Sequence, residues 1–169
     1  MSNTQQTLEH ISTALLIPYA RNSRTHSLEQ VQQVANSIKE FGFTNPVLID
    51  ADNGIIAGHG RVMAAQSLGL EHVPCIRLAY LTESQKRAYT IADNQLALNA
   101  GWDDDVLRDE LLDLRDIDFD LSVTGFSIKD LENIMIIDND LGMDSQKNNN
   151  TDQADSLVQC PKCSTKFKP

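Results

Sequence analysis

Apolar positions in the first hundred residues alternate between helical spacing and short continuous runs. A capping box, Ser27-Leu28-Glu29-Gln30, opens a stretch with apolar residues three and four apart, which predicts a helix that Gly42 ends. A second helix is predicted over about 61–68, and a third from the capping box at Thr82 to about Leu96. Short apolar runs bounded by turn residues predict strands at 14–17, 47–49, 55–57 and 73–78.

This alternation of strands and helices predicts a compact α/β domain over residues 13–102. Residues 47–57 have the pattern of a hairpin around the turn Asp52-Asn53-Gly54. Pro74 places the start of the last strand at a sheet edge, because proline cannot donate a ladder hydrogen bond. Residues 1–12 are expected to form a flexible lead.

After residue 102 the apolar spacing continues beneath a strongly acidic surface. Residues 103–137 are predicted to form an acidic helical extension, with one helix beginning at Asp103-Asp104-Asp105 and another near Ser127. Residues 138–157 lack periodicity and are rich in Asn, Asp, Gln and Ser, which is typical of a linker or disordered segment. Residues 158–169 form a short tail with two cysteines.

The formal net charge is −10, and the acidic residues are concentrated in one segment. Residues 1–100 carry 8 acids and 7 Lys or Arg, whereas residues 101–144 carry 14 acids and 3 Lys or Arg. This balance opposes strong non-specific binding to nucleic acid but leaves room for a local basic site in the first hundred residues. We interpret the acidic stretch as a solvated helix face; a surface that mimics nucleic acid or docks a basic partner is the alternative.

The composition also predicts the cellular compartment. No apolar run approaches the ~20 residues that span a bilayer, so a membrane-spanning helix is excluded. The N-terminus lacks a signal-peptide pattern, and three cysteines without such a signal do not indicate a disulfide framework. We therefore expect a cytoplasmic protein in a reducing environment.

The segment Gly58-His59-Gly60-Arg61 joins the strand at 55–57 to the helix that follows. Glycines let the backbone approach a ligand closely, the first helical N–H groups have no partner within the helix, and the helix dipole favours negative charge there. Arg61 adds a fork of donors that suits phosphate oxygens. The segment therefore predicts a phosphate site; a tight turn with a surface arginine is the alternative.

Three ordered blocks between Leu15 and Trp102 resemble the N-terminal domain of ParB proteins, in the ParB/sulfiredoxin-like superfamily. The first is IPYARNSR (Ile17–Arg24), followed by a helix that ends in SIKEFGFTNPVLI. The second, IIAGHGRVMAAQSLGLEHVP (Ile55–Pro74), resembles the family's G-E-R-R-x-x-A box, and the third, IADNQLALNAGWD (Ile91–Asp103), resembles its Glu-Asn box. The resemblance covers a little over half the chain and implies a ParB/sulfiredoxin-like α/β domain with a small mixed sheet.

In that family the boxes surround a nucleoside triphosphate, so the resemblance implies that this chain binds CTP or ATP together with Mg²⁺. Asp93 and Asn94 fall at the Glu-Asn pair that helps to hold the metal, and their oxygens suit Mg²⁺. A polar helix end is the alternative for these two residues. The resemblance implies Arg24, Gly58 and Arg61 as phosphate-binding residues, and His59 and Gly60 join them because they lie in the same turn. A solvated loop charge is the alternative for Arg24.

Three departures from the family limit what the resemblance implies. His59 and Gly60 stand where ParB proteins usually have Glu and Arg, so one phosphate-binding arginine is missing. Sulfiredoxins place a catalytic cysteine in this turn, whereas here Cys75 lies on the following strand, so sulfiredoxin chemistry is not expected. After residue 102 we expect no ParB-type helix-turn-helix or dimerisation domain, because an acidic helical segment stands there and disfavours a partition-type DNA clamp.

The resemblance implies a role in DNA metabolism, in a short protein of the kind that phages and mobile elements carry. Two functions remain open. One is a Mg-dependent NTPase or nuclease, in which His59 is the candidate catalytic residue because imidazole can transfer protons near neutral pH. The other is a non-catalytic, nucleotide-responsive regulator or adaptor for a DNA-binding or DNA-modifying partner. A solvated turn histidine is the alternative for His59.

The tail sequence Cys160-Pro161-Lys162-Cys163 has the spacing of half a zinc knuckle. A structural zinc site usually needs four protein ligands, and all four histidines lie far upstream. A closed Zn site therefore requires a second chain, and two tails in a homodimer would supply Cys160 and Cys163 twice. A tail without metal is the alternative.

Overall fold

The computed structural model describes residues 6–135, 158–159 and 166–167. The chain divides into two units, residues 1–136 and 137–169. In the second unit, β5 (Val158–Gln159) pairs antiparallel with β6 (Lys166–Phe167). The predicted zinc ligands Cys160 and Cys163, and the predicted linker over 138–157, lie outside the described residues, so both interpretations stay predictions.

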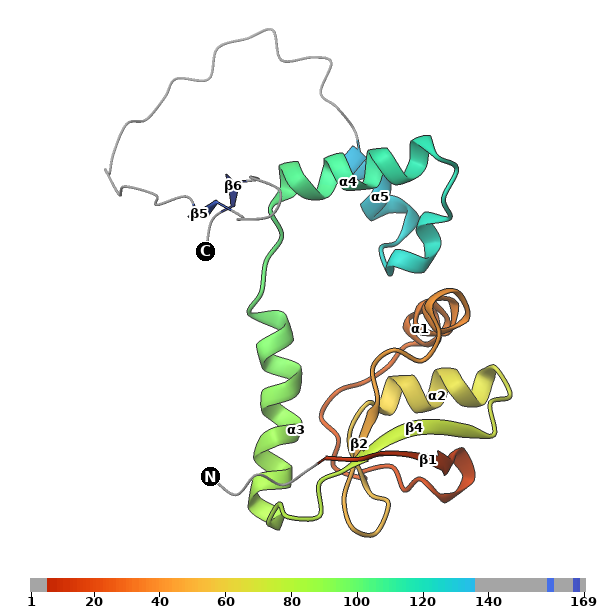
Figure 1. Cartoon of the computed structure of the whole chain (residues 1–169), viewed down its shortest axis with the longest axis vertical. Coiled ribbons are helices and arrows are strands. Elements are labelled where there is room, and N and C mark those ends of the chain that lie inside the picture. The colour runs from red at the N-terminus through yellow and green to blue at the C-terminus, as the bar shows by residue number, and fades with distance from the viewer. Residues whose placement is uncertain (1–5, 136–157, 160–165, 168–169) are drawn as a thin grey trace, which may run out of the picture. The chain divides into compact units, whose positions relative to one another are not determined.

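A four-stranded mixed sheet in the order β1-β4-β2-β3 forms the centre of the first unit (Figure 1). β1 pairs antiparallel with β4, β4 pairs parallel with β2, and β2 pairs antiparallel with β3. The predicted hairpin and the predicted small mixed sheet are therefore confirmed. The strands are β1 (Leu8–Ser12), β2 (Val47–Ile49), β3 (Ile55–Ala57) and β4 (His72–Arg77).

The helices begin where the sequence places caps. The Ser27 hydroxyl accepts from the Gln30 amide, and Thr82 and Gln85 form a complete capping box. α2 begins at His59, two residues before its predicted start, because Gly58 is its N-cap. The helices are α1 (Leu28–Phe41), α2 (His59–Ser67), α3 (Glu83–Leu98), α4 (Asp104–Asp116) and α5 (Ile128–Met135), with short 3-10 turns η1 (Thr13–Leu15) and η2 (Leu121–Thr124).

The core joins the sheet to α2, and α2 to α1. Val62 and Ala65 of α2 pack against buried strand residues that include Ile49 and Val73. On the other side of α2, Ala64 packs against α1, so that α2 lies between the sheet and α1 (Figure 1). Ala64 and Ala65 are fully buried, and small side chains at these positions let α2 approach both neighbours closely. The start of α2 is therefore held on two sides.

Three sequence predictions about the start of the domain and the edge of the sheet are wrong. Residues 8–12, expected in a flexible lead, form β1, so the domain begins before residue 13. Residues 14–17, expected to form a strand, contain the end of η1 and a single bridge from Ile17 to Gly54. Because β1 covers β4, Pro74 lies in an internal strand opposite His10 and not at a sheet edge. Two of these errors, the lead and the position of Pro74, have one cause: β1 is stabilised by pairing with β4, which is distant in the sequence.

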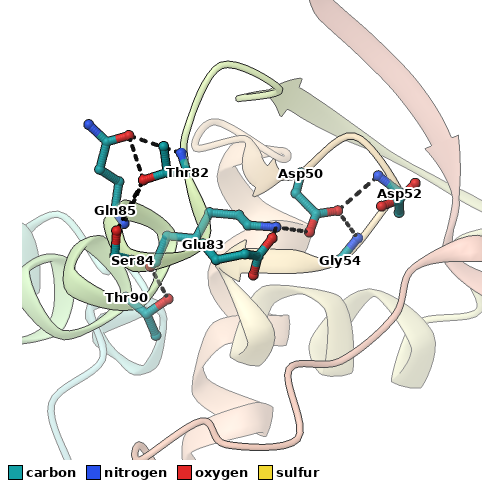
Figure 2. A network of polar contacts seen from close by, with 9 residues as sticks. Asp50, Asp52, Gly54, Thr82, Glu83, Ser84, Gln85 and Thr90 are labelled. Carbon is teal, nitrogen blue, oxygen red and sulfur yellow. Dashed lines mark hydrogen bonds and ion pairs between the residues drawn. The ribbon is translucent and has the colours of Figure 1, made fainter.

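An ion-pair network fastens α3 to the hairpin (Figure 2). Oδ2 of Asp50 accepts from Nζ of Lys86 at 2.8 Å, and Lys86 also pairs with Glu83. Oδ1 of Asp50 accepts from the amides of Gly54 (2.7 Å) and Asp52 (3.0 Å). Burial raises the pKa of Asp50, but the lysine and the two amides outweigh it, so that the pKa of Asp50 is lowered.

The Asp50→Asn substitution is expected to lower the free energy of unfolding by about 1–2 kcal/mol at pH 7. A carboxyl group with a lowered folded-state pKa stabilises the fold above its ordinary pKa of 3.8, and this contribution is lost as the pH falls through the folded-state value. The deficit of the variant should therefore shrink in urea denaturation near pH 3. Asp52→Asn, at an exposed carboxyl group, is the control. An equal deficit at both pH values would contradict the prediction.

Candidate functional site

The turn between β3 and α2 requires glycine at two positions for two different reasons. Gly58 has φ +102°, a left-handed conformation that other residues rarely adopt. A Cβ atom at Gly60 would lie 3.1 Å from the ring of His26, which packs against it. The amides at the start of α2 have no acceptor within the helix, and they carry the positive end of its dipole. The turn therefore has the backbone features that commonly bind an anion.

Arg61 lies half-buried beside this turn. Its Nη1 donates to the carbonyl oxygen of Asn45 at 2.7 Å. Burial lowers the pKa of Arg61, while the charge of Asp93 and the Tyr89 side chain act in the opposite direction. An arginine remains a cation at neutral pH under these conditions. Arg61 therefore places a fixed positive charge at the mouth of the turn.

His59 fixes the loop that faces the turn. Its Nε2 accepts from the amide of Tyr19 at 3.1 Å, which leaves the proton of the neutral ring on Nδ1. Burial lowers the pKa of His59, and the neighbouring His26 lowers it further. His59 is therefore neutral at pH 7, and one of its two nitrogens is already bonded.

The first and third sequence blocks meet across the pocket. Oδ1 of Asn22 accepts from the amide of Arg24 at 3.2 Å, and Nη1 of Arg24 donates to Oδ1 of Asn94 at 2.9 Å. Nδ2 of Asn94 donates to the carbonyl oxygen of Thr90, one turn earlier in α3, at 2.7 Å. The loop before α1 is thus joined to α3 at the level of the glycine turn.

These segments enclose an open pocket of about 180 Å³. Two guanidinium groups and two imidazoles line it, against one exposed carboxylate, so its charge favours an anion. His26 and Gln30 also line the pocket and were not predicted as site residues; the position of His26 beside the helix cap, just after Arg24, is the only sequence signal for it. All of the predicted phosphate and magnesium residues line this pocket: Arg24, Gly58, His59, Gly60, Arg61, Asp93 and Asn94.

Asp93 and Asn94 alone supply few of the oxygen ligands that Mg²⁺ needs, so a bound phosphate group and water would have to supply the others. Oδ1 of Asn94 accepts from the cationic Arg24, and Asp93 is the one carboxylate that lines the pocket. Within residues 6–135, no group of three or more His, Cys, Asp or Glu side chains is arranged to hold a metal ion. Mg²⁺ prefers several oxygen ligands in octahedral geometry. The predicted role of Asp93 and Asn94 as Mg²⁺ ligands therefore stays a prediction.

The fold and site define a small α/β protein with a pocket lined by glycines and arginines at the start of a helix. A family model described as the ParB N-terminal domain matches residues 1–95. The ParB-like nuclease domain-containing protein YnaK of Escherichia coli (strain K12) is 62% identical over 72 residues, which cover 43% of this chain and 83% of YnaK. The chain belongs to the ParB N-terminal domain family.

Two ParB proteins extend the comparison. The probable chromosome 2-partitioning protein ParB of Deinococcus radiodurans is 35% identical over 74 residues, covering 42% of this chain but only 25% of that protein. The structure of C-terminally truncated ParB from Caulobacter crescentus, complexed with CTP-gamma-S, has a TM-score of 0.61 at 22% identity. That match covers 76% of this chain and 77% of the other, and it shows a shared fold.

A second family model corrects the expectation for the segment after residue 102. The model, described as the ParB-methyltransferase HTH domain, matches residues 105–165. This match contradicts the expectation that no ParB-type helix-turn-helix domain follows residue 102. The sequence interpretation missed this similarity because α4 has Asp or Glu at most exposed positions, which is unusual for a DNA-binding segment. In the part of the chain that the structure describes, no helix is long and apolar enough to cross a membrane.

The Gly58→Ala substitution is expected to destabilise the fold by roughly 1–3 kcal/mol, because a side chain at this φ is strained. The added Cβ would also lie 3.0 Å from the guanidinium group of Arg61. Gly101→Ala is the matched control, since its φ is not in the left-handed range and nothing lies within 4 Å of its Cβ position. Chemical denaturation of both variants would test this, and equal stabilities would show that the turn does not need glycine.

Proposed function

We propose that this chain binds a nucleoside triphosphate in the pocket at the glycine turn and acts in DNA metabolism as a nucleotide-responsive ParB-like protein. The observation that carries this proposal is the meeting of three donor groups at one pocket. The free amides of α2, Arg61 beside them and Arg24 on the opposite wall all face the same space. The Caulobacter ParB with the same fold is complexed with CTP-gamma-S, which supports CTP as the first nucleotide to test.

The separation of the donors favours a chain of phosphates over a single one. The helix start can hold one phosphate group, as helix N-termini commonly do. Arg24 reaches the pocket from another segment and from the side of α3. A ligand with several phosphate groups offers oxygens to donors from both segments, which favours it over inorganic phosphate. CTP and ATP meet this requirement, and the pocket alone does not choose between their bases.

The site favours binding over turnover. A general base needs a free acceptor near the attacking water, but Nε2 of His59 is bonded to Tyr19. Asp93 is the only carboxylate that lines the pocket, and it is exposed. We therefore place a non-catalytic regulator or adaptor first, acting with DNA or a DNA-modifying partner, which the match to a ParB-methyltransferase HTH domain supports.

Metal-dependent hydrolysis of nucleotide or DNA is the second candidate, favoured by the description of YnaK as a ParB-like nuclease domain-containing protein. In this reaction Asp93 would be the carboxylate beside the phosphates and His59 the candidate proton-transfer group. The phage or mobile-element origin, the cytoplasmic location, the tail zinc site and a homodimer through the tail remain predictions of the sequence.

Isothermal titration with CTP, ATP and GTP, each with and without Mg²⁺, tests the binding proposal. Arg61→Gln is expected to weaken binding by roughly 10- to 100-fold, because it removes a charged donor to phosphate worth about 1.5–3 kcal/mol. Arg87→Gln is the matched control, since Arg87 is exposed on α3 and does not line this pocket. Far-UV circular dichroism should show that both variants are folded. Absence of binding by the unaltered chain to every nucleotide would reject the proposal.

Phosphate release and plasmid nicking, with Mg²⁺ or Mn²⁺, separate the two candidate functions. We expect nucleotide binding without turnover that depends on this site. If turnover is found, it belongs to this pocket only when Asp93→Asn abolishes it and Asp104→Asn, on the exposed start of α4, does not. Turnover lost in Asp93→Asn but not in the control would make the chain an enzyme and reject the regulator.

A further inference from the structure

Thr90 is the only buried polar side chain within residues 6–135, with 6% of its surface exposed. Its hydroxyl lies 3.0 Å from the carbonyl oxygen of Ile56 on β3 and 3.0 Å from that of Lys86, one turn earlier in α3. The hydroxyl has one proton, so it is shared between the two carbonyl oxygens; the contact with Lys86 is a local one that a helical threonine commonly makes. The bond to Ile56 joins two segments that are 34 residues apart.

The Ile56 carbonyl belongs to an edge strand. β3 ends the sheet, so its outward backbone groups have no further strand to pair with. The loop at Ile17 pairs with the beginning of this edge, through the amide of Ile55. Thr90 supplies a donor to the next part of it. A buried carbonyl without a donor costs free energy, so this contact fixes where α3 lies along β3.

The same residue stands at the start of the hydrogen bonds that hold Arg24. The Thr90 carbonyl accepts from Asn94, and Asn94 in turn accepts from Arg24. Ile56 lies two residues before Gly58, where the phosphate turn begins. One continuous chain of hydrogen bonds thus joins β3 ahead of the turn, α3 and the loop before α1. Thr90 lines the neighbouring cavity, together with Asp50 and Lys86, and does not line the phosphate pocket.

We propose that Thr90 is a positioning residue for the phosphate pocket. Its hydroxyl sets α3 against β3, and Asn94 then holds the Arg24 guanidinium on the wall opposite the glycine turn. A shift of α3 moves Asn94 and Arg24 together, and the two donor groups for the phosphates lose their spacing. The effect on affinity rests on the proposed function, whereas the order of Arg24 does not depend on any ligand.

Two comparisons at position 90 test the positioning role of Thr90 in the full chain. In each comparison one side chain has a hydroxyl group and the other lacks it. Thr90→Val keeps the volume and removes the hydroxyl, to be compared with the unaltered threonine. Thr90→Ala and Thr90→Ser repeat the comparison with smaller side chains, in case the valine variant does not fold. The ligand-free measurement is the NMR signal of the Arg24 guanidinium group, assigned through Arg24→Lys. The second measurement is the affinity for CTP and for inorganic triphosphate, at a temperature where circular dichroism shows each variant folded.

The valine and alanine variants should lose the restricted Arg24 signals and bind about tenfold more weakly, the loss expected for one hydrogen bond. Thr90→Ser should keep both properties within about twofold of the unaltered chain. A purely structural role would lower the melting temperature and leave Arg24 and the affinity of the folded protein unchanged, which would overturn the proposal. An equal loss in the serine variant would also overturn it. If the unaltered chain binds neither probe, the proposed function fails while the Arg24 signals still decide the role of Thr90.

Discussion

The contact of α2 with the sheet on one side and α1 on the other is the constraint on which the site depends. Ala64 and Ala65 are fully buried between these layers, so the axis of α2 can move little without opening the core. Because Gly58 precedes the first residue of α2, the direction of the free amides follows from this packing. Core packing therefore fixes the side of the pocket that α2 forms, and loops complete the other side.

The other side of the pocket consists of polar contacts that span long distances in the sequence. Arg24 and Asn94 are 70 residues apart, and Tyr19 and His59 are 40 residues apart. These bonds assemble a cationic site in a chain whose formal net charge is −10. Charge at this site is therefore a local property of a few positioned groups, and the overall charge of the chain does not reveal it.

Local signals predicted most of the fold, and long-range pairing accounts for the errors. The caps at Ser27 and Thr82 fix helix starts because the side chain bonds within its own turn. β1 could not be found in this way, since its partner Ile76 lies far from Leu8, and Leu8 itself is exposed. The glycine turn was visible in the sequence, whereas the hydrogen bond between Asn94 and Arg24 exists only in the folded chain.

The hydrogen bond between Tyr19 and His59 has a consequence for acidic conditions. It requires a neutral imidazole, and the lowered pKa of His59 keeps the ring neutral at pH 7. Acidification through that pKa adds a proton to Nε2 and turns the acceptor into a donor, so the Tyr19 amide loses its partner. The same proton adds a positive charge beside His26 and Arg61, in a pocket that attracts anions. Protonation thus releases one anchor of the loop and strengthens the electrostatic attraction of the pocket, two effects of opposite sign from one titration.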